Sequence, residues 1–148
     1  MIKITSPNFE NNSEIPKDFT CDGKGLMPDL KIEGVPAEAK SLVLIIEDPD
    51  APAGLWTHFL AANIDPKTEA IVSGQIPAGA VIGETSAGSL DYHGPCPPSG
   101  THRYFFKIYA LDFVLDLKES YQRTELEDTI KNHVLDSGEL IGLYSRTR

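Results

Sequence analysis

The stretch from Ser41 to Ile64 constrains the fold of this chain more strongly than any other. It opens with a nearly continuous apolar run, Ser41–Glu47, whose length and β-branched residues favour a buried strand over a helix. Pro49 and Pro52 then interrupt the pattern, because proline fixes φ and donates no backbone hydrogen bond. A second apolar run follows over Trp56–Ile64. We therefore predict a central strand, a proline-stiffened turn and an antiparallel partner strand.

A second stretch repeats this arrangement. Residues 91–104 form a segment rich in proline, glycine and histidine, and the run Phe105–Leu111 that follows it is typical of a strand. Alternate residues of a strand point to the same face of a sheet. One buried face is therefore predicted for Tyr104, Phe106, Ile108 and Ala110.

The remaining segments carry shorter signals. Residues 1–40 contain short extended pieces separated by turns, with a strand predicted at Leu30–Ile32. Residues 66–91 are predicted to be rich in loops, with short strands near Ile71 and at Ala80–Ile82. A last strand is predicted at Glu139–Tyr144.

One helix is predicted late in the chain. Thr124 and Glu127 have the spacing of a capping box, with Thr124 as the N-cap. Leu126, Ile130 and Val134 would form the apolar stripe of a helix packed on a sheet. Many short strands and one late helix together predict a mainly β fold, a β-sandwich or β-roll with a peripheral helix.

Length and charge limit the classes of function. With 148 residues, we expect a single domain spanning 1–148. Thirteen basic and 22 acidic residues give a net charge of −9, and the sequence has no basic cluster. Nucleic acid and anionic membrane surfaces are therefore not expected as partners, since both are bound through Lys and Arg.

The N-terminus and the longest apolar runs bear on localisation. No apolar run reaches the roughly 18 residues that a membrane span needs, so no stable membrane insertion is expected. Residues 1–5 lack the apolar core of a secretory signal. We therefore expect a cytoplasmic protein.

The two cysteines, Cys21 and Cys96, do not form a Cys-x-x-Cys pair, so a zinc ribbon is not indicated. Our first interpretation is two reduced, partly buried thiols, because cytosolic disulfides are uncommon outside hyperthermophiles. A disulfide joining the two residues is the alternative.

Five polar side chains are predicted where strands meet loops: Asp48, Asp50, His58, His102 and Tyr104. Each also has a purely structural interpretation. Aspartates favour turns, because their carboxylates bind nearby backbone N–H groups. The histidines and the tyrosine are also compatible with core positions, and Trp56 with packing. His93 and His133 have no supporting context, and we interpret them as surface residues.

The sequence contains no known catalytic or metal-binding motif. Two aspartates and two histidines could bind a divalent ion, but their spacing is not that of a metal motif, and no metal or cofactor is expected. The sequence has no Gly-x-Ser-x-Gly elbow, phosphate-binding P-loop or dinucleotide fingerprint. We therefore do not expect an enzyme.

Three motifs resemble a known family. They are the segments 48–52 (DPDAP) with Trp56-x-His58, 94–104 (GPCPPSGTHRY) and 19–23 (FTCDG). Together they resemble the phosphatidylethanolamine-binding proteins, in particular their bacterial and archaeal branch, described as Raf kinase inhibitor-like. The resemblance implies a β-sandwich of two antiparallel Greek-key sheets with a C-terminal helix.

The resemblance also implies a small surface pocket that accepts anions such as phosphate, phosphoethanolamine or acetate. The positions that match pocket residues of the family are Asp48, Asp50, Pro52, Trp56, His58, Tyr92, Gly94, His102 and Tyr104. A kinase or a protease as protein partner, and a homodimer, are left open by the sequence.

Two carboxylates in an anion pocket require an explanation. We expect Asp48 and Asp50 to hydrogen-bond His58 and His102, which favours the charged imidazolium form. The histidines and Tyr104 would then hold the anion. The predicted function is small-anion binding in a regulatory role. The alternatives are a serine protease inhibitor acting through residues 66–91, and a phosphoester hydrolase or lyase using the Asp/His cluster.

Overall fold

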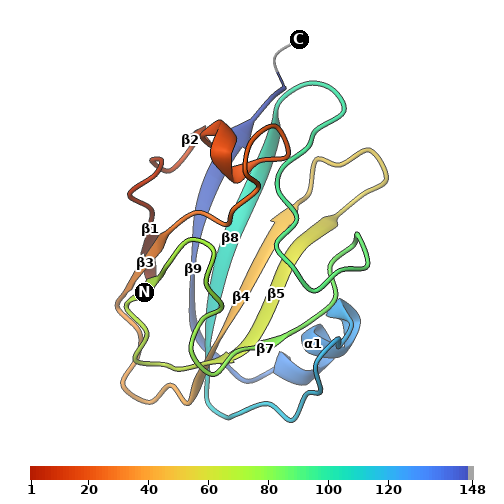
Figure 1. Ribbon diagram of the computed structural model, residues 1–148. Helices are drawn as coiled ribbons and strands as arrows, with labels where there is room; N and C mark the ends of the chain where they lie inside the picture. The colour runs from red at the N-terminus through yellow and green to blue at the C-terminus, as the bar shows by residue number, and fades with distance from the viewer. Residues whose placement is uncertain (147–148) are drawn as a thin grey trace.

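A computed structural model describes residues 1–146. Its elements in chain order are β1 Lys3–Thr5, β2 Ser13–Glu14, the 3-10 helix η1 Lys17–Phe19, β3 Leu30–Glu33, β4 Ser41–Asp48, β5 Trp56–Ile64, β6 Ala70–Ile71, β7 Val81–Ile82, β8 His102–Leu111, α1 Arg123–Ile130 and β9 Val134–Tyr144. The described part of the protein is mainly β, as predicted, with two sheets and one α-helix near the C-terminal end (Figure 1).

The larger sheet has six strands in the order β2-β9-β8-β4-β5-β7, and the smaller has three in the order β1-β3-β6. Strand β4 lies between β5 and β8, antiparallel to both, and all eight of its residues are buried. The predicted central strand and its partner are therefore confirmed. The short strands predicted near Ile71 and Ile82 are also present, as β6 and β7.

The two faces of the large sheet bury different residues. The face toward the small sheet contains alternate residues of the central strands, among them Leu42, Leu44, Ile46, Tyr104, Phe106, Ile108 and Ala110. This confirms the face predicted for β8. The opposite face packs under α1, where Val43, Ile45, Leu60 and Leu111 form a cluster with Leu126 and Ile130 of the helix.

One strand pair departs from the antiparallel arrangement that the resemblance implies. β2 pairs with β9 in parallel, with Ser13 opposite Gly142. The side chain of Ile15 lies directly over Gly142, where a Cβ would come within 2.5 Å of it. The close approach of the N-terminal segment to β9 thus requires glycine at this position.

The helix begins two residues earlier than the capping box predicts, at Arg123. Gln122 is the N-cap, and no side chain caps the helix. The predicted cap was wrong because Glu127 binds Arg123 instead, with Nε of Arg123 donating to Oε1 at 3.1 Å.

The predicted apolar stripe ends at Ile130. Val134 begins β9 and is 43% exposed, so its assignment to the helix was wrong. The chain leaves the helix through Asn132, whose φ of 68° is in the left-handed region that asparagine tolerates. β9 consequently starts five residues before the predicted strand.

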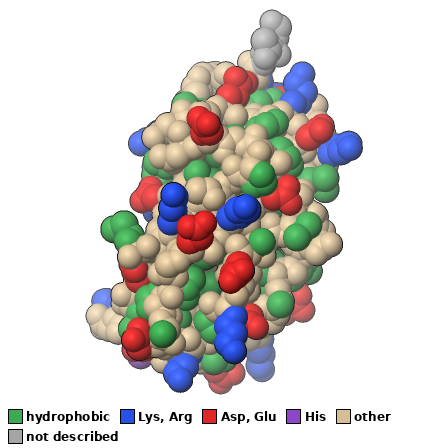
Figure 2. Space-filling view, turned by 90° about the vertical axis from the view of Figure 1, so that its left-hand side faces the viewer, with side chains coloured by type: hydrophobic (Ala, Val, Ile, Leu, Met, Phe, Trp, Pro, Cys, Tyr) green, Lys and Arg blue, Asp and Glu red, His purple; other side chains and the backbone are tan. Residues whose placement is uncertain are grey.

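The smaller sheet and the N-terminal segment form one side of the molecule. Figure 2 shows acidic and basic side chains interspersed over this face. Within residues 1–146, the structure has no helix that is long and apolar enough to cross a membrane.

A buried ion network connects α1 to the sheet. Glu47, which is buried, accepts a hydrogen bond from Nζ of Lys107 at 2.9 Å and another from Nη2 of Arg123. Arg123 also donates to Oγ1 of Thr57 at 2.9 Å. Burial raises the pKa of Glu47, but the two cations outweigh it and hold the pKa below its usual value.

We predict that Glu47→Gln lowers the free energy of unfolding at pH 7 by about 2 kcal/mol, because hydrogen bonds to a charged group are lost. Since the folded-state pKa of Glu47 is depressed, its contribution is present above the unfolded pKa of about 4.3 and is lost as the pH falls below it. Urea unfolding should therefore show a difference between parent and variant that shrinks on acidification below pH 4.

The matched control is Glu127→Gln, which removes the exposed partner of the same arginine. Exposed pairs contribute about 0–1 kcal/mol, so this variant should unfold close to the parent. Equal destabilisation by both variants would contradict a specific role of the buried network.

Candidate functional site

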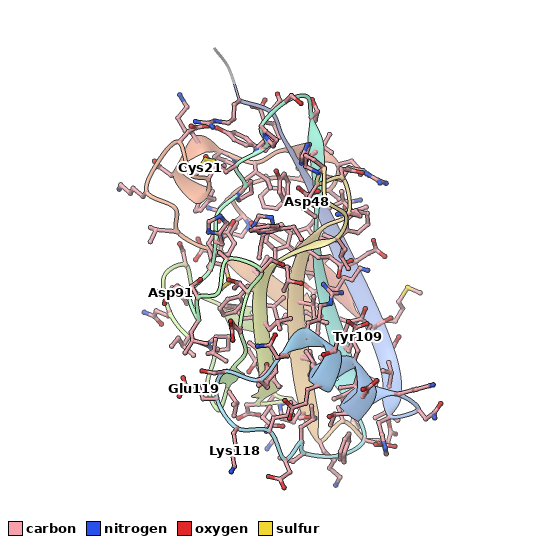
Figure 3. All side chains as sticks on the ribbon, turned by 90° about the vertical axis from the view of Figure 1, so that its right-hand side faces the viewer. Cys21, Asp48, Asp91, Tyr109, Lys118 and Glu119 are labelled. Atoms are coloured by element: carbon pink, nitrogen blue, oxygen red, sulfur yellow. A yellow bond between two sulfur atoms is a disulfide. The ribbon has the colours of Figure 1, made fainter. Side chains whose placement is uncertain are left out.

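The two loops singled out in the sequence meet at one end of the sandwich. Residues 49–55 connect β4 to β5, and residues 91–101 lead into β8 (Figure 1). Between them lies a cavity of about 190 Å³, lined by Asp48, Ala51, Pro52, Trp56, His58, His93, Cys96, Pro97, Pro98, His102 and Tyr104. Figure 3 places Cys21 and Asp48 at this end and α1 toward the other.

Two larger hollows lie elsewhere, of about 710 Å³ along residues 1–6 and β9, and about 830 Å³ along β3 and β6. The small cavity differs from them in collecting a buried carboxylate, imidazoles and a phenol from separate strands. Convergent polar groups in an otherwise apolar cavity are typical of a ligand site.

Asp48 is 3% exposed and positions His102. Its Oδ2 accepts a hydrogen bond from Nδ1 of His102 at 2.7 Å, and its Oδ1 accepts from the backbone N of Asp50 at 2.7 Å. Both carboxylate oxygens therefore already have a donor. The expected contact of Asp48 with a histidine is present, and it fixes the ring through Nδ1.

His58 is held in a different way. Its Nδ1 contacts the carbonyl oxygen of His93, and a carbonyl can only accept, so Nδ1 carries the hydrogen. In the neutral ring, Nε2 then carries the lone pair. Burial lowers the pKa of His58 to about 4, although the hydrogen bond to His93 and the charge of Asp48 act in the opposite direction. The expectation that both histidines are charged was therefore wrong for His58.

Tyr104 contributes a hydroxyl without a partner. The residue is fully buried, and its Oη makes no hydrogen bond within the described part of the chain. The ring meets His58 edge-on, with centroids 5.3 Å apart, and stacks on His102 at 6.3 Å. Burial raises the pKa of Tyr104, as do Asp48 and Asp50, so the group remains a donor.

Asp50 does not contact a histidine, contrary to expectation. Arg103 donates to its carboxylate from the backbone N, Nε and Nη2, each at 2.9 Å. These hydrogen bonds lower the pKa of Asp50 to about 2 against a smaller effect of burial. Asp50 thus ties the 49–55 loop to β8 and is not part of the cavity lining.

Two other predicted site residues lie behind the cavity. The hydroxyl of Tyr92 donates to the carbonyl of Phe19 at 2.9 Å. Gly94 packs on Thr20, whose backbone would be 3.0 Å from a Cβ at this position. Both residues hold the 91–101 loop against the segment around η1 and are outside the cavity lining.

The cysteines are joined, so our first interpretation of two reduced thiols was wrong. A disulfide connects Cys21 to Cys96, with Cα atoms 5.4 Å apart. It fastens the same loop to the same segment as Tyr92 and Gly94. Spacing alone could not reveal it, because 75 residues separate the two cysteines.

His93 was predicted to be a surface residue, and it lines the cavity instead. Its backbone N donates to the carbonyl of His58 at 3.0 Å, and its ring stacks on that of His58 with centroids 5.8 Å apart. The available signal was its position between Tyr92 and Gly94, both of which match the family. His133 is partly exposed and pairs with Asp112.

The wall of the cavity is apolar and aromatic. Trp56 is partly exposed, and its ring lies 6.2 Å from that of His93. Pro52, Pro97 and Pro98 complete the wall. Among residues 1–146, no group of three or more His, Cys, Asp or Glu side chains is placed to hold a metal ion.

Comparison with known proteins identifies the family. The sequence model of the phosphatidylethanolamine-binding proteins matches residues 5–145. The chain belongs to this family.

Relatives of the chain occur in archaea and bacteria. It is 47% identical over 143 residues to a UPF0098 protein of Methanothermobacter thermautotrophicus, covering 93% of this chain and 95% of that protein. It is 40% identical over 150 residues to a UPF0098 protein of Chlamydia trachomatis, covering 98% and 99% of the two chains.

Solved structures agree with the fold. The crystal structure of CT736, a phosphatidylethanolamine-binding protein homologue of Chlamydia trachomatis, superimposes with a TM-score of 0.95 at 40% identity, covering 99% of this chain and 98% of that one. YbcL of Escherichia coli superimposes with a TM-score of 0.91 at 24% identity, covering 99% of both chains, and shows the fold alone.

The depressed pKa of His58 predicts how this family member responds to acid. The unfolded chain takes up a proton near pH 6.5 and the folded one near pH 4, so stability due to His58 is lost as the pH falls through this window. The expected loss from His58 between pH 7.5 and 5 is about 2 kcal/mol. Urea unfolding of the parent and of His58→Phe should show a weaker pH dependence in the variant, and an equal dependence would contradict the prediction.

Proposed function

We propose that the cavity binds a small anion, namely phosphate or a phosphomonoester such as phosphoethanolamine, and that the protein acts in regulation by binding phosphorylated ligands or partners. The main support is Tyr104, whose hydroxyl is fully buried, lines the cavity and has no partner within residues 1–146. A buried donor without an acceptor costs about 1–3 kcal/mol, which a ligand oxygen would recover.

The size of the cavity supports a small ligand group. Its volume of about 190 Å³ corresponds to roughly six water molecules at ~30 Å³ each. This is below the 300–1,000 Å³ that is usual for drug-sized ligands. A phosphate group with a short substituent fits this volume, whereas the rest of a phosphorylated partner would remain outside.

The charges around the cavity are compatible with an anion despite Asp48. His102 lies against the carboxylate, which accepts its Nδ1–H at 2.7 Å, and the second carboxylate oxygen is satisfied by the backbone of Asp50. Asp50 is neutralised by Arg103. Asp48 therefore acts as a positioning residue, and the ring edges of His58 and His102 remain for the ligand together with Tyr104.

We predict saturable binding of phosphate and phosphoethanolamine, measured by the fluorescence of Trp56, the only tryptophan of the chain. Tyr104→Phe should weaken binding about tenfold or more, since hydrogen bonds to charged groups contribute about 1.5–3 kcal/mol.

Tyr92→Phe is the matched control. It removes a tyrosine hydroxyl that binds a carbonyl outside the cavity lining, so affinity should be kept while stability decreases. Absence of binding by the folded parent, or an unchanged affinity in Tyr104→Phe, would contradict the proposal.

The two alternatives predicted from the sequence gain no specific support. Residues 66–91, the segment considered for protease inhibition, are tied down by β6, by β7 and by a bond from the backbone N of Ser73 to Asp29 at 2.8 Å. Hydrolase or lyase activity of the Asp/His cluster is likewise untested. Both stay predictions.

A further inference from the structure

We propose that the pocket accepts an anion only when the anion carries a proton of its own, and that His58 is the residue that selects for it. Phosphomonoesters in their monoanionic form would be bound, whereas anions of the same shape and charge without an O–H would be rejected. This inference rests on the proposed anion site and specifies its ligand class.

His58 offers a lone pair, and not a hydrogen, to the cavity. The carbonyl of His93 occupies Nδ1–H, so a neutral His58 offers only the lone pair of Nε2 to a ligand. A ligand oxygen that carries no hydrogen would direct its own lone pair at the lone pair of Nε2, and the two would repel each other. A ligand O–H would instead donate to Nε2 and form a hydrogen bond.

The surroundings of His58 keep its ring neutral. The titratable groups that act on it are Asp48 of β4, which favours the imidazolium, and His93 of the 91–101 loop and His102 of β8, which oppose it when protonated. His58 is 4% exposed, and its burial is the largest influence, which places the pKa at about 4. At pH 5.5 only about one molecule in thirty would carry the proton.

Tyr104 and Asp48 determine what the other oxygens of the ligand must do. Tyr104 donates its hydroxyl, whereas both oxygens of Asp48 already accept hydrogen bonds and add negative charge. A suitable ligand therefore has one oxygen that accepts from Tyr104 and another that donates to His58. A phosphomonoester monoanion, or dihydrogen phosphate, has both kinds of oxygen on one phosphorus atom.

Two chemically similar anions lack the donor. A sulfate monoester has the shape and charge of a phosphomonoester monoanion but no O–H. A phosphodiester, such as the headgroup of a phospholipid, also has a single negative charge and no O–H. Phosphomonoesters have a second pKa near 6. Close to neutral pH they therefore change from the monoanion, which the pocket would bind, to the dianion, which it would reject.

The experiment compares methyl phosphate with methyl sulfate by calorimetry at pH 5.5, using the whole parent protein. Methyl phosphate should bind at least tenfold more tightly. Its affinity should then fall roughly 50- to 100-fold between pH 5.5 and pH 8, as the monoanion disappears. Phosphoethanolamine should likewise be preferred over glycerophosphoethanolamine, which separates a free monoester from a lipid headgroup.

His58→Phe keeps a ring in place and removes the acceptor, so the preference for methyl phosphate over methyl sulfate should shrink to within threefold. If this variant does not fold, the inference is still tested by the affinities of the parent for methyl phosphate and methyl sulfate. Equal affinity of the parent for methyl phosphate and methyl sulfate would overturn the inference and leave the anion site intact. Failure of the parent to bind either anion would overturn both.

Discussion

The pairing of β4 with β5 and β8 is the constraint on which the site depends. Because this strand is hydrogen-bonded on both sides and buried along its whole length, its last residue, Asp48, enters the interior as a carboxylate. A buried carboxylate requires donors, and it obtains them from His102 and from the turn that follows. The same strand pairing brings His58 and Tyr104 to this end of the sheet.

The 91–101 loop completes the site because it is fastened at several points. The disulfide from Cys96, the hydroxyl of Tyr92 and the close packing of Gly94 all attach it to residues 19–21. The loop thereby presents the carbonyl of His93 to His58 and determines which nitrogen of that ring carries a hydrogen. Tyr92 and Gly94, which do not line the cavity, thus help to set its hydrogen-bonding character.

The sequence predicted the strands and most of the cavity lining, but not the partner of Asp50, the disulfide or the charge of His58. The buried strands followed from apolar runs ended by proline, and motif resemblance located most of the lining. The partner of Asp50 was missed because both aspartates were assigned to the histidines, although Arg103 directly follows His102. The disulfide was missed because a spacing of 75 residues is uninformative. The charge of His58 was missed because burial, which no local pattern records, outweighs the nearby carboxylate.

The tautomer of His58 can be measured directly, from a long-range ¹H–¹⁵N spectrum of the ligand-free protein at pH 7. We expect a neutral ring with its hydrogen on Nδ1 and an unprotonated Nε2. A hydrogen on Nε2, or a doubly protonated ring, would contradict this expectation, because the cavity would then offer a donor where the structure places an acceptor.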